Sequence, residues 1–218
     1  MKSVPSAKCL LLSAILLITT ATIYQEHRLF FDFRYSRSAV ILFAIVLIFT
    51  VVITNIVFSR IAKEYGKSDS LSPFSSYLQV FVFLMLALLI NVPFFFSDWP
   101  KIHVGLWTLS SGLVLLFLGG MVTLLPMKIF GSWKKVIGNK TNRLDTAGFY
   151  RYSRNPQLVG YGIFLLGFTF LWPSFFAIIS YLVYCYISYK MVGVEEAHLK
   201  HTFGKEYLDY CHKTPRYL

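Results

Sequence analysis

The chain has 218 residues, of which 56% are hydrophobic and only 14% are charged, and its formal net charge is +11. Soluble domains average roughly 45–50% apolar and about 25% charged residues, so this composition excludes an ordinary soluble protein and indicates an integral membrane protein. The positive charge does not require a nucleic-acid partner, because basic loops on the cytoplasmic face of a membrane protein give the same excess. The length suits one domain, and we expect residues 1–218 to form a single membrane domain.

Apolar runs of membrane length recur from the N-terminus onward. A helix that spans a bilayer needs about 20 mostly apolar residues, with a range of roughly 17–25. Residues 1–126 are expected to contain four such helices, at Cys9–Tyr24, Ala39–Phe58, Tyr77–Phe96 and Ile102–Pro126. Lys2 and Lys8 before the first run also fit a signal peptide, but Thr20-Ala21-Thr22 is a poor cleavage site, which favours a retained first segment.

A further apolar region, residues 158–188, is interrupted by Trp172-Pro173. Because proline disfavours helix continuation, we expect a helical hairpin with the arms Pro156–Leu171 and Ser174–Tyr189. The alternative is one kinked helix. The predicted fold is an all-α, multi-pass transmembrane helical bundle of about six segments, followed by a C-terminal interfacial helix.

The charges of the loops predict the direction of the passes. With six passes and a cytoplasmic N-terminus, the inner segments carry 17 of the Lys and Arg residues and the outer loops carry four. This bias is the positive-inside signature. A single kinked last helix would put the loop Lys128–Arg154 and the tail on opposite sides, whereas the hairpin puts both in the cytoplasm. We therefore expect both termini and the active site to be cytoplasmic.

The segment Gly148-Phe-Tyr-Arg-Tyr-Ser-Arg-Asn-Pro156 lies where a basic loop meets an apolar run. Asn155-Pro156 predicts a helix start, because Asn is a strong N-cap and Pro is favoured at the first helical position. A helix N-terminus attracts anions, and Arg151 and Arg154 lie one turn apart just before it. The two arginines could bind an anionic ligand or lipid phosphates, and the local chemistry does not choose between them.

Two adjacent carboxylates, Glu195 and Glu196, follow the second apolar arm. They could attract a cationic ligand, pair with Arg151 or Arg154, or belong to a solvated helix face. Beyond them, apolar side chains recur every four residues. This period predicts an interfacial amphipathic helix that could roof the site, with its apolar face formed by Leu199, Phe203, Tyr207 and Cys211.

Metal-ligating residues form no recognisable set. Glu195-x-x-His198, with His201 beyond it, invites a di-iron interpretation, but that architecture needs a second copy and two further acids inside the bundle. No second copy occurs, and we expect no metal. No disulfide framework or CxxC motif is expected either, because the cysteines are widely spaced, at Cys9, Cys185 and Cys211.

These motifs, in this order, resemble the isoprenylcysteine carboxyl methyltransferase family, integral-membrane enzymes related to the phospholipid methyltransferases. The resemblance covers roughly residues 142–218 and rests on Gly148–Pro156, Gly160, Glu195-Glu196, Phe203-Gly204, Tyr207, Tyr210 and Pro215-Arg216. The first four passes match only in being hydrophobic. The resemblance implies that residues 127–218, which comprise the loop, the hairpin and the tail, form a methyltransferase site.

The resemblance further implies S-adenosylmethionine as the methyl donor and a lipophilic or lipidated acceptor that enters from the membrane lipids. The implied donor contacts are Asn142, Arg143, Leu144, Asp145, Tyr150, Asn155, Pro156, Gln157, Leu158 and Glu195. The donor carboxylate suits the helix N-terminus with its flanking arginines, its ammonium suits Glu195 or Glu196, and its sulfonium suits the aromatic face of Tyr150. Arg154 and Glu196 are expected as catalytic residues. Gly119 and Gly120 resemble a stretch that lies beside the donor in the phospholipid branch, although close helix packing is the favoured alternative.

Two departures leave the acceptor open. The family usually has His where Asn155 stands, and often an Arg about one turn before the paired acids, where this chain has Lys190 and Met191. Lys190 is the expected substrate-binding residue, although an ammonium lacks the bidentate fork of Arg. A carboxyl group is the first choice of acceptor, and a phospholipid amine, with Glu196 as the base, or a thiol is the second. The rivals are a non-catalytic transport or scaffold protein and a nicotinamide-dependent membrane reductase.

Overall fold

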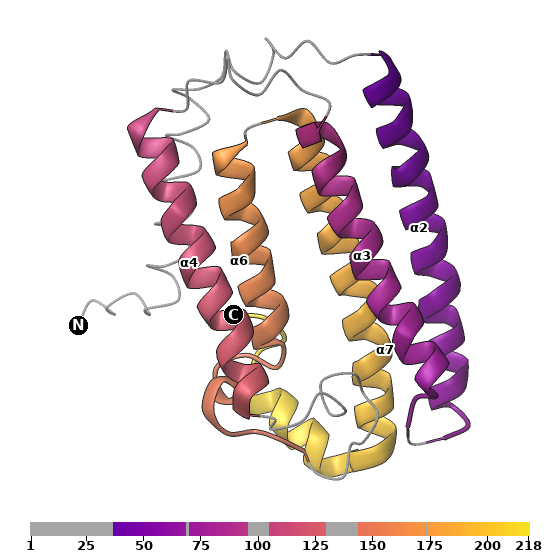
Figure 1. The fold of residues 1–218 in the computed structure, drawn as a ribbon. Helices are drawn as coiled ribbons and strands as arrows, with labels where there is room; N and C mark the ends of the chain where they lie inside the picture. Colours follow the sequence, from indigo (N-terminus) through magenta and orange to yellow (C-terminus); the bar gives the residue numbers. More distant parts are fainter. Residues whose placement is uncertain (1–36, 69, 96–104, 130–143, 173) are drawn as a thin grey trace, which may run out of the picture.

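The computed structural model describes residues 37–68, 70–95, 105–129, 144–172 and 174–218. Within these ranges the regular structure is entirely helical, which confirms the all-α prediction: α2 (Arg37–Tyr65), α3 (Pro73–Phe95), α4 (Leu106–Ile129), the short 3₁₀ helix η2 (Gly148–Arg151), α6 (Pro156–Leu171) and α7 (Phe175–Lys213). Successive long helices run in alternating directions, with α4 and α6 as one pair and α2, α3 and α7 as a group beside it (Figure 1).

Several of these helices suit a bilayer. Long apolar stretches capable of crossing a membrane occur in four described helices, namely α2, α3, α4 and α7. Helix α6 is apolar but has only 16 residues. The chain is therefore an integral membrane protein. The predicted first segment, Cys9–Tyr24, lies outside the described residues, and the count of six passes stays a prediction.

Helix α6 begins and ends at the predicted residues. Pro156 occupies its first turn, where its missing N–H costs nothing, and Asn155 is the N-cap residue. The Asn155 side chain does not cap the helix, however. Its Nδ2 instead donates to the main-chain oxygen of Arg216 at 2.9 Å, so this side chain ties the helix entry to the C-terminal tail.

Helix α7 extends well past the predicted second arm. It begins after Ser174, whose Oγ accepts a hydrogen bond from the Ala177 N–H at 3.1 Å, and it continues through Tyr189 to Lys213. The expectation that the arm ends at Tyr189 was therefore wrong: Glu195 and Glu196 lie within the helix. The length of the apolar run hid this, because charged residues appear from Lys190 onward while the chain remains helical.

A bend at Gly204 divides α7. Gly204 has φ 50° and ψ −118°, a conformation that residues with a side chain rarely adopt. Figure 1 shows the part of α7 beyond this bend turning toward the lower ends of α4 and α6. The predicted amphipathic helix matches this part only in its second half, because Tyr207 and Cys211 lie beyond the bend while Leu199 and Phe203 lie before it. The buried side chains beyond the bend are Tyr207 and Tyr210.

Small residues allow α4 and α6 to pack backbone against backbone. Gly112 and Gly119 on α4 meet Gly160 and Gly167 on α6, and on each helix the two glycines are seven positions apart. A Cβ added at Gly119 would lie 2.3 Å from the Phe164 N atom, and one added at Gly160 would lie 2.5 Å from the Thr123 N atom. Close packing is therefore the observed role of Gly119, as is usual for small residues between membrane helices.

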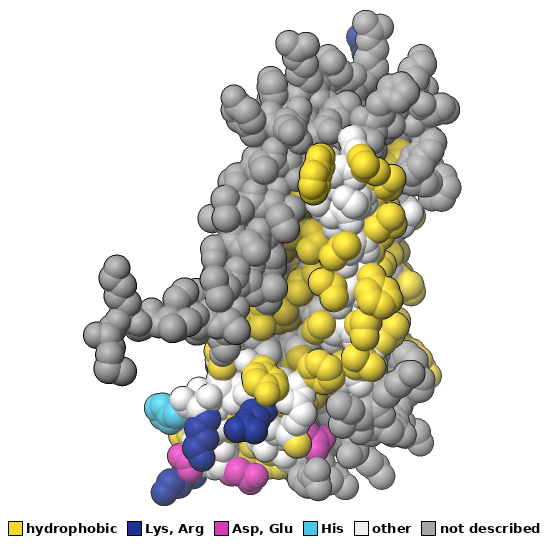
Figure 2. Space-filling view, turned by 90° about the vertical axis from the view of Figure 1, so that its left-hand side faces the viewer, with side chains coloured by type: hydrophobic (Ala, Val, Ile, Leu, Met, Phe, Trp, Pro, Cys, Tyr) yellow, Lys and Arg dark blue, Asp and Glu magenta, His cyan; other side chains and the backbone are white. Residues whose placement is uncertain are grey.

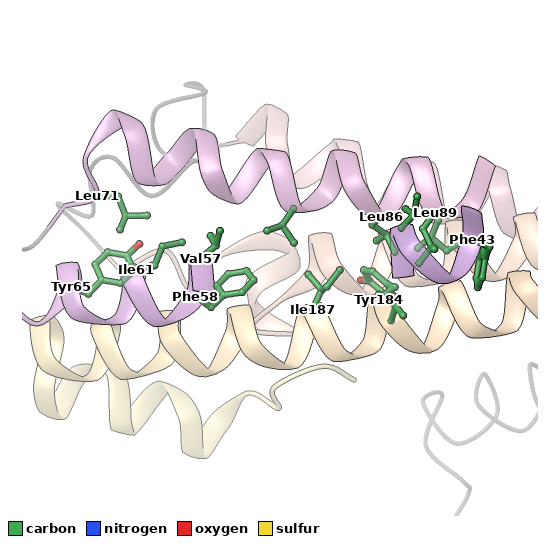
Figure 3. Packing of buried hydrophobic residues seen from close by; sticks show 14 residues of the cluster. Phe43, Val57, Phe58, Ile61, Tyr65, Leu71, Leu86, Leu89, Tyr184 and Ile187 are labelled. Carbon is green, nitrogen blue, oxygen red and sulfur yellow. The ribbon is translucent and has the colours of Figure 1, made fainter. Parts of the chain in front are cut away.

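The hydrophobic core lies between α2, α3 and α7 (Figure 3). Val57 and Ile61 of α2, Leu86 and Leu89 of α3 and Ile187 of α7 are at most 2% exposed. This core fixes the position of α7 against α2 and α3, and with it the side chains that α7 carries beyond the apolar region.

Candidate functional site

Polar and charged side chains gather at one end of the molecule, while hydrophobic side chains cover most of the described surface above it (Figure 2). At this end α2 finishes, α3 and α6 begin, and the second half of α7 carries Glu195 and Glu196 (Figure 1). The topology thus brings the α2–α3 turn, the start of α6 and the second half of α7 to one place.

Glu196 holds the entry of α6 and the C-terminal tail together. Its carboxylate forms an ion pair of 2.8 Å with Arg154 and a second one with Arg216, whose Nε donates to Oε1 at 3.1 Å. We call these contacts of Glu196 with Arg154 and Arg216 the clasp. A backbone hydrogen bond adds to the clasp, because the Arg154 N–H donates to the Pro215 oxygen at 3.0 Å. Of the alternatives open for the paired acids, ion pairing with Arg154 is the one that the structure contains for Glu196.

Arg154 has further partners on the bent end of α7. Its Nη1 lies 3.3 Å from the Tyr207 hydroxyl and 2.7 Å from Cys211 Sγ. The side chain is 14% exposed, so it is held inside the clasp, whereas Arg151 is exposed. The two arginines of the motif therefore have different environments, which spacing along the sequence did not distinguish.

Glu195, one residue along α7, faces a different set of groups. Its partly buried carboxylate accepts a hydrogen bond from Gln79 and lies near the hydroxyl groups of Tyr65 and Tyr150. Adjacent residues of a helix point about 100° apart, so one acid can face the clasp while the other faces this group of side chains.

Tyr150 is fixed by the tail as well as by burial. Its main-chain oxygen accepts a hydrogen bond from the Tyr210 hydroxyl at 2.6 Å. Burial raises the pKa of the Tyr150 hydroxyl well above its ordinary value, and the negative charge of Glu195 raises this pKa further. Tyr150 is therefore a neutral phenol near neutral pH, suited to donating a hydrogen bond or offering its ring to a cation.

The remaining predicted donor contacts border the same place. Leu144 and Asp145 are half-buried, and Asp145 lies near Tyr150. Gln157 carries a buried Nε2 that has no hydrogen-bond partner among the described residues. The Leu158 carbonyl accepts a hydrogen bond from the Tyr184 hydroxyl, and Pro156 is buried. Asn142 and Arg143 lie outside the described residues.

Lys190 lies away from this group. Its ammonium sits 5.8 Å from the ring centre of Tyr186, whose hydroxyl donates to Asn55 of α2 at 2.7 Å. Five positions along a helix correspond to a rotation of about 140°, so Lys190 and Glu195 point in different directions around α7. Lys190 therefore faces the α2 side of the helix.

The described residues contain no group of three His, Cys, Asp or Glu side chains that could hold a metal ion. His198 is buried and stacks on the ring of Tyr65, with ring centres 3.9 Å apart and an interplanar angle of 12°. His198, the second residue of the Glu195-x-x-His198 motif, thus packs against an aromatic ring of α2.

Comparison with known proteins finds a family match in the second half of the chain. Residues 107–206 match the sequence model of the phospholipid methyltransferase family. These residues form a phospholipid-methyltransferase-type segment. The segment includes α6, the paired acids and most of α7, and it ends before the tail that completes the clasp.

The curated relatives agree with this family. The chain is 28% identical over 122 residues to the protein-S-isoprenylcysteine O-methyltransferase of Homo sapiens, which covers 54% of this chain and 43% of that enzyme. It is 33% identical over 91 residues to the enzyme of that name from Schizosaccharomyces pombe, covering 38% of this chain and 37% of the relative. The matched part thus spans less than half the length of these relatives. The resemblance to the isoprenylcysteine carboxyl methyltransferases is confirmed, and no solved structure matches the chain.

Sequence reasoning missed two residues at the site because they come from outside the phospholipid-methyltransferase-type segment. Gln79 and Tyr65 belong to α3 and α2, which lie before residue 107, where the family match begins. The expectation that the first four passes match only in hydrophobicity was wrong for the fourth, because the match covers nearly all of α4. A signal was present for Gln79, which is a polar residue inside an otherwise apolar run. Tyr65 ends α2 and gave no such signal.

We expect the clasp to depend on Arg154 and not on Arg151. The change Arg154→Gln leaves Glu196 with Arg216 alone, and losing a hydrogen bond to a charged, largely buried group is expected to cost about 1.5–3 kcal/mol. The change Arg151→Gln removes an exposed charge and is expected to alter stability by less than about 0.5 kcal/mol. Thermal unfolding in detergent compares the two, and equal midpoints would contradict the clasp.

Proposed function

We propose that the protein is an S-adenosylmethionine-dependent methyltransferase of the membrane that methylates a carboxyl group on a lipophilic or lipidated acceptor. One observation carries this proposal: Tyr150 and Glu195 lie near each other at the end of the bundle where α6 begins. Both residues are donor contacts implied by the family resemblance, and both lie within the matched segment. They are 45 positions apart in the numbering, so the fold, and not the sequence spacing, makes them neighbours.

The residues present fit the donor. An S-adenosylmethionine molecule carries an ammonium, a carboxylate and a sulfonium. Glu195 supplies a partly buried negative charge for the ammonium, and the neutral ring of Tyr150 can face the sulfonium. The unpartnered Nε2 of Gln157 and the free N–H groups at the start of α6 suit the carboxylate. Because Arg154 is engaged by Glu196, we assign anion binding to the helix start and not to this guanidinium.

The chain would act mainly by holding the two reactants. When bound, S-adenosylmethionine supplies an electrophilic methyl group on its sulfonium. Placing an acceptor in line with that group and excluding water can contribute about 7–11 kcal/mol to catalysis. We infer that Arg154 and Glu196 serve this purpose by clasping the tail onto α6, which encloses the site.

The ion pairs of Glu196 bear on the chemical class of the acceptor. A carboxylate acceptor needs no base, whereas a phospholipid amine must first lose a proton. Glu196, the residue nearest to such a role, is held between two guanidinium groups. The arrangement therefore favours a carboxyl acceptor over an amine. Because Lys190 and Glu195 point about 140° apart around α7, we do not assign Lys190 to the donor end, and its contact with the acceptor stays a proposal.

We further propose the topology that the charges of the loops predict. The chain would cross the membrane six times with α6 and α7 as a hairpin, both termini would be cytoplasmic, and the acceptor would enter from the inner leaflet. The site would then face the compartment that contains the donor, and the aqueous end of the bundle would be its charged end (Figure 2).

The test is methyl transfer by the purified protein in lipid vesicles. With methyl-labelled S-adenosylmethionine, we expect label on an isoprenylated cysteine in a form that alkali releases, because carboxyl methyl esters hydrolyse and N-methyl or S-methyl groups do not. Phosphatidylethanolamine is the competing acceptor. Alkali-stable label on that lipid would overturn the carboxyl assignment, and absence of saturable donor binding would favour the non-catalytic scaffold.

A further inference from the structure

Helix α3 reaches the candidate site although it lies outside the segment that matches the methyltransferase family. Its contribution is Gln79, which is 9% exposed and lies in the first two turns of the helix. The side chain faces α7, because its Nε2 lies 3.6 Å from Met191 Sδ. Met191 and Glu195 are four residues apart, so they occupy one face of α7.

The Gln79 side chain also donates a hydrogen bond to the Glu195 carboxylate. A buried amide without a partner costs about 1–3 kcal/mol, which explains why this polar group, set in an apolar helix, turns to an acid on α7. A carboxylate has two oxygens with about four acceptor positions. A donor on one side fixes the plane of the group and leaves further positions for a second donor.

We propose that Gln79 is a positioning residue that orients the Glu195 carboxylate toward the ammonium of the methyl donor. This inference rests on the proposed function. The inference makes α3 part of the donor site. The segment that matches the family supplies the Glu195 carboxylate, and Gln79 of the preceding part of the chain orients that carboxylate. Gln79 touches neither the sulfonium nor the acceptor and acts through Glu195.

The alternative is that Gln79 only joins α3 to α7. Polar side chains commonly hydrogen-bond between membrane helices, and such a role would affect stability and all ligands alike. A positioning role is selective, because it affects only ligands that carry the ammonium. The two roles therefore predict different patterns of binding.

The experiment measures the affinity of the full chain in detergent for two probes, S-adenosylmethionine and 5′-methylthioadenosine, which lacks the amino-acid end. In Gln79→Met, which keeps the length of the side chain and removes the donor, we expect affinity for S-adenosylmethionine to fall about three- to tenfold and affinity for 5′-methylthioadenosine to stay within about twofold. In Gln79→Glu, whose charge opposes that of Glu195, the selective loss should be larger. Thr54→Val is the matched control, since Thr54 is a buried polar residue whose Oγ1 donates within α2, to Thr50 O at 2.6 Å.

A double-mutant cycle completes the test. If Gln79 acts through Glu195, adding Gln79→Met to Glu195→Gln should weaken binding little further. Equal loss for both probes, or unchanged affinity in both Gln79 variants, would overturn the positioning role and leave the proposed function intact. Failure of the wild-type chain to bind S-adenosylmethionine would instead overturn the proposed function and this inference with it.

Discussion

Replacing Glu195 by glutamine is expected to weaken S-adenosylmethionine binding at least tenfold, or about 1.4 kcal/mol. The substitution keeps the size of the side chain and its capacity to accept from Gln79 while removing the charge that would pair with the donor ammonium. Titration of the purified protein in detergent, followed by calorimetry or equilibrium dialysis, measures the change in affinity directly.

A matched control lies on the same helix. Glu206 is exposed and lies beyond the bend at Gly204, so Glu206→Gln changes the net charge equally without touching the site. We expect its donor affinity to equal that of the wild type. Equal affinity of the Glu195 variant and the wild type would remove Glu195 from the donor site, whatever the activity of the protein.

The second large effect is expected in the contact between α4 and α6. In Gly119→Ala the new Cβ would lie 2.3 Å from Phe164 N and 2.7 Å from Gly160 O, both main-chain atoms of α6. Backbone cannot move aside as a flexible side chain can, so the helices must separate. Overpacking of this kind costs about 1–3 kcal/mol, occasionally more, and we expect a clearly lower thermal midpoint in detergent.

The neighbouring residue provides the comparison. A Cβ at Gly120 would have Phe164 Cδ2 as its nearest neighbour, at 4.0 Å, which is an ordinary contact. Gly120→Ala is therefore expected to be neutral or to stabilise the helix by up to about 1 kcal/mol, because alanine favours the helix. If the two alanine variants unfold at the same temperature, the close approach of α4 and α6 is not as described.

Prediction from the sequence succeeded where a local rule decides the structure. The start of α6 at Pro156 follows from the fixed φ of proline and its missing N–H, and the end at Leu171 follows from the Trp172-Pro173 step. The predicted end of α7 at Tyr189 was wrong because contacts with distant parts of the chain, and not a local rule, decide how far this helix extends. Charged residues appear from Lys190 onward and end the long apolar run, yet the helix continues because its more polar half packs against α2, α3 and the tail.

The sequence by itself determined the composition of a membrane protein, the apolar runs, the entry of α6 and the motifs of the methyltransferase families, because each depends on residues that are close together along the chain. Only the tertiary structure decided how the paired acids divide their partners. Glu196 turns to Arg154 and Arg216, while Glu195 turns to Gln79 and Tyr150. The physical reason is that neighbouring side chains on a helix diverge by about 100°, and what each one meets depends on which distant helices pack on either side.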